Sequence, residues 1–176
     1  MTTNRREVIK GLALLPALGL MPTLGVRPAR AGEAPGGLAR ATLAIHAAEG
    51  PWRLEVELAE TPAQRRRGLM ERDHLDAEAG MLFLYDGPQP PESGFWMYRT
   101  RIPLDIAFID AAGRIAAIHT MAPCEGDDPG QCRAYPAGVA YRAALEVNAG
   151  YFADRDIGIG DCVSWPGAAA SCSVEG

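Results

Sequence analysis

Lysine is almost absent from the chain, since Lys10 is the only one among 176 residues. It lies in an N-terminal segment that we expect to be removed, so lysine Schiff bases and lysine general bases are excluded from the mature protein. The sequence also has no Gly-x-Ser-x-Gly, no glycine-rich phosphate loop, no dinucleotide-binding fingerprint and no Cys-x-x-Cys. These absences speak against serine hydrolase, nucleotide-binding, zinc-knuckle and thioredoxin-like chemistry.

Apolar runs long enough to span a bilayer, about 20 residues, are missing as well. The uncharged stretch at residues 11–26 is shorter and contains several glycines and prolines. It follows the arginine pair Arg5-Arg6 and precedes residues 29–31, whose small-x-small form suits a signal peptidase. We therefore expect residues 1–31 to be a twin-arginine signal peptide that directs the protein to the periplasm and leaves no stable membrane anchor.

Positive charge is scarce in the expected mature chain. Residues 1–31 hold five of the 17 basic residues and one of the 22 acidic ones, which leaves 12 basic and 21 acidic residues, a net charge of −9. Nucleic acids and anionic membranes attract a positive field, so we expect neither as a partner. By length the remainder is one domain. We predict a leader at 32–40, a folded domain at 41–166 and a C-terminal tail at 167–176.

Four cysteines remain in the mature chain, and an even number in an oxidising compartment predicts two disulfides. Four cysteines allow three pairings. Because short loops close most readily, we favour the pairs Cys124–Cys132 and Cys162–Cys172. The first pair brackets a turn-forming loop, and the second would anchor a tail of small and polar residues.

Alternation of apolar and charged residues predicts strands. Positions 52, 54, 56 and 58 are apolar, and the residues between them are charged, which is typical of a strand with one face in the core. The upstream segment 43–45 alternates in the same way, and 48–51 suit a turn, so a first hairpin is expected. Further short strands are predicted at 81–85, 94–100, 104–110, 114–121, 141–148 and 162–165.

One short helix is predicted between Pro62 and Arg67. Thr61 suits the N-cap, Gln64 completes a capping box, and Gly68 can end the helix with a positive φ. Together with the strands, this helix predicts a β-rich α+β fold. We expect a compact, mostly antiparallel, barrel-like sheet with one or two short helices.

Four segments carry a resemblance to the family of small exported proteins called the domain of unknown function 192. These segments are 67–70, 94–97, 102–110 and 145–150. The resemblance runs from about Leu54 to Val163 and implies a compact β-rich fold without a defined activity. The family pattern continues after Met97 with Lys-Asn-Thr, whereas this chain has Tyr98-Arg99-Thr100. Arg99 therefore replaces the asparagine, and a function that depends on that asparagine is not expected in this chain.

The leading candidate site combines Trp96, Asp105, Glu146 and Asn148. Asp105 alternates with the apolar residues of its strand, and so do Glu146 and Asn148 in theirs. If the two polar faces converge with Trp96, they form a pocket with an aromatic wall, two carboxylates and an amide. Such a pocket suits a small molecule such as a sugar or peptide fragment of the cell envelope. Otherwise both carboxylates pair with arginines and stabilise the sheet.

These observations favour an exported, non-catalytic binding or accessory module of the cell envelope, with no resident cofactor. Two alternatives stay open. An envelope hydrolase would use Asp105 and Glu146. A Cu(I) carrier would use Met97, His119 and Met121, because thioether and imidazole groups suit Cu(I). Against copper, methionine commonly fills gaps in cores, and a single histidine on an apolar face is usually a hydrogen-bonded core residue.

Overall fold

The computed structural model describes residues 37–124, 126 and 128–168. Nine strands, one α-helix and two 3-10 helices make up this part of the chain. The strands are β1 (Arg40–Ala47), β2 (Gly50–Ala59), β3 (Ala79–Gln89), β4 (Gly94–Trp96), β5 (Leu104–Ile109), β6 (Ile115–Met121), β7 (Ala134–Pro136), β8 (Tyr141–Asn148) and β9 (Cys162–Ser164). The helices are α1 (Pro62–Arg67), η1 (Pro129–Gln131) and η2 (Ala153–Arg155). Within these residues, no helix is long and apolar enough to cross a membrane.

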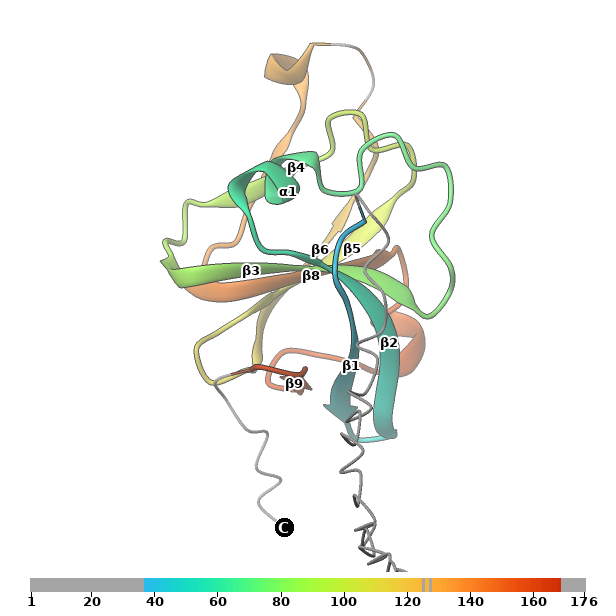
Figure 1. Ribbon diagram of the computed structural model, residues 1–176, viewed down its shortest axis with the longest axis vertical. Helices are drawn as coiled ribbons and strands as arrows, with labels where there is room; N and C mark the ends of the chain where they lie inside the picture. The colour runs from blue at the N-terminus through green and yellow to red at the C-terminus, as the bar shows by residue number, and fades with distance from the viewer. Residues whose placement is uncertain (1–36, 125, 127, 169–176) are drawn as a thin grey trace, which may run out of the picture. The chain divides into compact units, whose positions relative to one another are not determined.

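Seven strands form one curled sheet in the order β6-β5-β8-β3-β2-β1-β9, and β4 and β7 form a separate pair (Figure 1). Neighbouring strands are antiparallel except for β2 and β3, which run parallel. The predicted β-rich, mostly antiparallel fold is therefore confirmed. The parallel pair was not anticipated, and it arises because α1 lies in the connection between β2 and β3.

The two edge strands of the sheet approach each other, which curls the sheet into a half-barrel. Arg114, just before β6, forms an isolated bridge with Cys162 of β9. Two backbone hydrogen bonds extend this contact, from Ile115 N to the Asp161 oxygen at 2.9 Å and from Val163 N to the Gly113 oxygen at 2.7 Å. The predicted barrel-like closure thus exists at one end of the sheet, where it satisfies edge groups that would otherwise lack partners.

Local signals in the sequence account for the first hairpin and the helix. In the hairpin, Leu43 lies opposite Leu54 and Ile45 opposite Trp52, as the alternation predicts. At the start of α1, the backbone N–H of Gln64 donates to the Thr61 hydroxyl at 3.2 Å, and the backbone N–H of Thr61 donates to the side-chain oxygen of Gln64 at 2.8 Å. The capping box therefore satisfies two N-terminal donors.

The strand predicted at 94–100 is shorter in the structure and ends at Trp96. Thr100 N donates to the Met97 oxygen, which closes a turn, and Arg99 has a φ of 54° that no strand residue adopts. The short strand β7, which pairs with β4, was not predicted. Three residues are too few to produce a readable alternation.

Apolar side chains cover both faces of the curled sheet. All seven strands contribute to the core on the concave face, which includes Leu43, Val56, Leu145 and Val163. On the convex face, a second core lies between the sheet and the segments that carry α1, β4 and β7. It includes Met81, Phe83, Phe108, Met97 and Tyr135. Complete burial of such a side chain stabilises the fold by roughly 1.5–3 kcal/mol.

Candidate functional site

The predicted convergence of Asp105 with Glu146 is wrong, because the two side chains lie on opposite faces of the sheet. Residues directly opposite each other in paired strands share a face. In the register of β5 and β8, Glu146 lies opposite Ile106, whereas Asp105 lies opposite Val147. Both strands are central in the sheet and covered on both sides, so neither carboxylate emerges on a solvated face.

Asp105 has a structural role on the concave face. One carboxylate oxygen accepts a hydrogen bond from the Thr120 hydroxyl at 2.7 Å, and the other accepts one from the Gly150 amide at 2.9 Å. The side chain is 3% exposed. Asp105 therefore joins β5 to β6 and to the turn after β8, and a hydrolase that needs Asp105 beside Glu146 gains no support from this arrangement.

Asn148 connects the end of β8 to the loop before β3. Its side-chain amide donates to the Leu75 carbonyl at 3.0 Å and to the Asp76 carbonyl at 3.1 Å. Both donors of the amide are thus used within the protein. Asn148 fixes this loop over the convex core rather than contributing a free group to a pocket.

Trp96 and Glu146 do lie at one cavity, which is on the convex side of the sheet. The cavity has a volume of about 30 Å³ and lies between the end of α1, β4 and β8. Glu146 is 4% exposed, whereas Trp96 is 46% exposed and forms an outer wall. Burial raises the pKa of Glu146 to about 8. Because a low-dielectric site disfavours the charged form, this carboxyl carries a proton at neutral pH.

The residues of the copper alternative lie at the convex core. Met97 and Met121 are buried there among aromatic and aliphatic side chains. The His119 ring packs against Phe108, and its Nε2 lies 3.0 Å from the Pro136 carbonyl oxygen. A carbonyl only accepts, so Nε2 carries the proton and donates. The part of the chain that the structure describes also holds no group of three or more His, Cys, Asp or Glu side chains that could bind a metal.

One of the two predicted disulfides is confirmed. Cys124 and Cys132 are bonded, with their Cα atoms 5.4 Å apart, and they close the loop that precedes β7. Cys172 lies outside the described residues, so the pairing Cys162–Cys172 stays a prediction. Peptide mapping under non-reducing conditions tests it, and a peptide that joins the 124–132 loop to the tail would contradict it.

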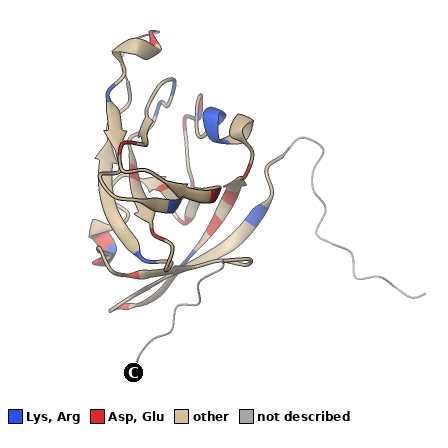
Figure 2. Cartoon of the chain, turned by 90° about the vertical axis from the view of Figure 1, so that its left-hand side faces the viewer, with Lys and Arg blue, Asp and Glu red and all other residues tan. Residues whose placement is uncertain are grey.

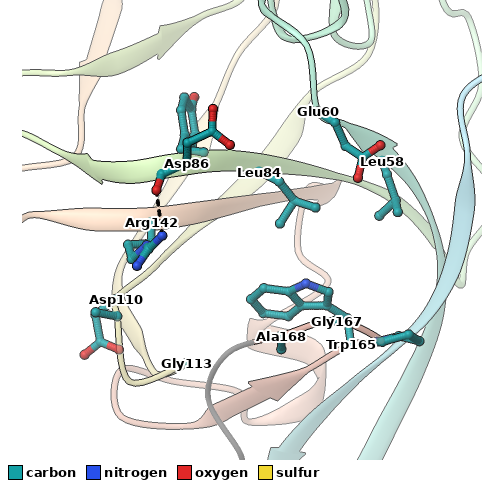
Figure 3. A pocket seen from close by; sticks show the side chains of 13 residues that line it. Leu58, Glu60, Leu84, Asp86, Asp110, Gly113, Arg142, Trp165, Gly167 and Ala168 are labelled. Atoms are coloured by element: carbon teal, nitrogen blue, oxygen red, sulfur yellow. Dashed lines mark hydrogen bonds between the residues drawn. The ribbon is translucent and has the colours of Figure 1, made fainter.

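A larger cavity opens on the concave side of the sheet, with a volume of about 350 Å³ (Figure 3). Its apolar lining includes Leu58 of β2, Leu84 of β3 and Trp165, which follows β9. These three side chains are partly buried and pack against the concave core. The indole of Trp165 extends across this pocket below Leu84, and offers a flat surface for a ligand.

Charged side chains surround this apolar lining. Glu60, Asp86 and Asp110 contribute carboxylates, and Arg142 contributes the one guanidinium among the described lining residues. The Arg142 guanidinium donates a hydrogen bond to the backbone carbonyl of Asp86 at 2.8 Å (Figure 3). This bond does not involve the Asp86 carboxylate. The pocket thus combines an apolar floor with a mainly acidic rim. We name it the concave pocket.

Sequence patterns did not reveal the concave pocket because its residues come from five separate segments. They lie in or directly after five different strands, β2, β3, β5, β8 and β9, and only the arrangement of these strands in the sheet brings them together. Trp165, the last residue of a predicted strand, is the one local signal for this pocket in the sequence.

Comparison with known families places the chain beside proteins without an assigned activity. The family model for the domain of unknown function 192, described as an uncharacterized ACR, matches residues 44–165. No curated protein matches the chain.

Solved structures include two similar proteins. A putative transcription regulator from Sinorhizobium meliloti 1021 is 31% identical, with a TM-score of 0.65 over 76% of this chain and 98% of that one. A protein of unknown function from Novosphingobium aromaticivorans DSM 12444 is 34% identical, with a TM-score of 0.66 over 74% of this chain and 88% of that one.

Proposed function

The chain belongs to the family of the domain of unknown function 192, and we propose that it is an exported, non-catalytic module that binds a small ligand in the concave pocket. The size and lining of this pocket carry the proposal. Small-molecule sites measure about 300–1,000 Å³ and combine apolar walls with a few polar groups. The concave pocket, at about 350 Å³, has both properties.

The lining favours a neutral or cationic ligand rich in hydrogen-bonding groups. Trp165 provides a flat apolar surface on which a sugar ring or an extended peptide can pack. Three carboxylates against one guanidinium repel anions such as nucleotides, whereas they accept hydrogen bonds from hydroxyl and amino groups. A sugar or peptide fragment of the cell envelope has this chemistry.

A binding role is favoured over catalysis by the kinds of residue present. Among the described residues that line the concave pocket there is no histidine, cysteine, serine or threonine. The side chains that most often act as nucleophile or general base in hydrolysis are therefore missing, apart from carboxylates at the rim. One of these, Asp110, already accepts hydrogen bonds from the Ala112 and Arg114 amides in its turn.

Export rests on the N-terminal sequence and on the disulfide. The twin-arginine pattern predicts transport of the folded protein, and the Cys124–Cys132 bond fits an oxidising compartment. The Sinorhizobium relative is described as a putative regulator of transcription. The expected net charge of −9 argues against a similar role here, because DNA binding depends on positive charge. In Figure 2 the acidic residues, coloured red, are spread over strands and connecting loops.

Native mass spectrometry of protein purified from its own compartment tests this function. We expect the parent to carry an organic mass that Trp165→Ala releases, because the variant loses the flat wall of the pocket. Trp96→Ala is the matched control, since this tryptophan lies at the cavity on the opposite face and its replacement should leave the mass bound. Equal retention by Trp165→Ala, or release by Trp96→Ala alone, would contradict the proposal.

A further inference from the structure

The small cavity on the convex face contains a buried acid without a partner. Glu146 is 4% exposed, and no residue in the described ranges forms a hydrogen bond or an ion pair with its carboxyl group. Buried polar groups normally have such partners, and a buried carboxyl without one is costly. The Glu146 carboxyl group, which lines the cavity and has no partner, is therefore available to bind a ligand that enters it.

Elements from both layers of the fold build this cavity. Glu146 on β8 and Phe83 on β3 form its floor on the sheet side, and Trp96 on β4 and Thr100 line it from the covering layer. The last turn of α1 and the following Gly68 complete the lining. Its volume of about 30 Å³ is enough for one or two groups of the size of water.

Three arginines of α1 also line the cavity, but two have other partners. The Arg65 guanidinium lies over the Tyr85 ring at 4.7 Å and donates to the carbonyls of Glu60 and Leu84. Arg67 pairs with Glu71 across one turn, at 3.4 Å. The third, Arg66, is exposed at the end of the helix. Within the described residues, none of these cations is paired with Glu146.

We propose that this cavity is a subsite for a primary ammonium group, which hydrogen-bonds to Glu146 while the rest of the ligand packs on Trp96. An ammonium head is close to water in size, so the cavity admits it and excludes a branched or quaternary head. The three N–H groups of the ammonium can donate hydrogen bonds to the Glu146 carboxyl group, which has no other partner among the described residues. The site lies on the opposite face from the concave pocket and is independent of it.

One neighbour of Glu146, Trp96, suits a cationic ligand. Trp96 is 46% exposed and lies beside Tyr98, with ring centroids 5.7 Å apart. Indole faces attract cations, by roughly 0.5–2 kcal/mol. An ammonium beside the carboxyl would also lower the pKa of that group, because an opposite charge favours the ionised form. Binding should therefore expel the proton that burial keeps on Glu146 in the free protein.

Other charged and titratable groups near Glu146 could also make ligand binding depend on pH. Tyr85 on β3 lies close enough to interact with it electrostatically, and burial raises the pKa of this tyrosine above its usual value. The arginines of α1 stay charged at all relevant pH values. On β5 the opposite residue is Ile106, and on β4 the neighbours are Phe95 and Trp96, none of which titrates. Between pH 6 and 8, Glu146 is thus the group that should govern binding.

Calorimetric titration of the mature protein with ethylammonium chloride tests the subsite. We expect the affinity to rise about tenfold per pH unit from pH 6 to 7 and to level off above pH 8, because the ionised fraction of Glu146 rises in that way. Titrations at pH 7 in two buffers of different ionisation enthalpy should show about one proton released per ammonium bound. Glu146→Gln should abolish both effects.

Control ligands and variants distinguish this subsite from nonspecific cation binding to an acidic protein. Tetramethylammonium, which has no N–H and is too large, should not compete. Glu49→Gln, at an exposed position in the β1–β2 turn, should behave like the parent. An affinity that does not change with pH, equal binding by Glu146→Gln, or equal competition by potassium or tetramethylammonium would overturn the assignment.

Discussion

Replacing Glu146 with glutamine should change how the stability of this protein depends on pH. Burial raises the pKa of Glu146 to about 8 from an ordinary value of 4.5. Between these two values the folded protein keeps a proton that the unfolded chain has released. The stability of the parent should therefore fall as the pH rises through this range, and the loss should be complete above pH 8. Glutamine does not titrate, so the variant avoids the loss.

The size of the effect follows from proton linkage. One pKa unit corresponds to about 1.36 kcal/mol, so the penalty is under about 1 kcal/mol at pH 5 and roughly 3 kcal/mol at pH 7. We expect the stability of Glu146→Gln relative to the parent to increase by roughly 2.5 kcal/mol between pH 5 and pH 7. Any effect of the new amide on packing is the same at both pH values, so it cancels in this change of relative stability with pH.

Urea unfolding of both proteins at pH 5, 6, 7 and 8, followed by far-UV circular dichroism, measures these free energies. All other titrating groups are shared by the two proteins and cancel in the difference. Glu49→Gln is the control, because it makes the same replacement at an exposed position in the β1–β2 turn, away from the cavity. If Glu146→Gln follows Glu49→Gln at every pH, Glu146 is ionised in the folded state and the reasoning about its cavity is refuted.

Three further variants test other parts of the fold and its export. Asp105→Ala should lower the free energy of unfolding by about 1–3 kcal/mol, because the Thr120 hydroxyl and the Gly150 amide lose their acceptor. A loss below about 0.5 kcal/mol in chemical unfolding would contradict this. Serine at both Cys124 and Cys132 should cost at most about 2.5 kcal/mol in the same assay, since the closed loop is short, and a cost twice as large would argue against a local effect. Lysine at both Arg5 and Arg6 should keep the precursor in the cytoplasm, and cell fractionation that finds mature protein in the periplasm at the parental level would exclude the twin-arginine route.

The sequence predicted those features that depend on neighbouring residues. The hairpin of β1 and β2 follows from alternation within ten residues, and the capping box of α1 follows from residues three positions apart. β5 and β6 match the strands predicted at 104–110 and 114–121, and Gly113 between them has a positive φ of 78°. The Cys124–Cys132 pair belongs to the same class, because only eight positions separate its members.

Long-range pairing accounts for what the sequence could not show. Alternation assigns one face of a strand to the core, and this rule holds only where the other face is solvated. β5 and β8 are buried on both faces, so the polar positions of Asp105 and Glu146 do not indicate exposure. Their relative faces depend on the register between two strands that are far apart in the chain, as does the assembly of the concave pocket from separate segments.

A crystal structure of the mature protein, purified from its own compartment without a denaturing step, would show directly whether the concave pocket holds a ligand. We predict electron density for a small organic molecule in the concave pocket, packed on the indole of Trp165 and hydrogen-bonded to the acidic rim. Density for a ligand elsewhere, with only water molecules against Trp165, would contradict this claim.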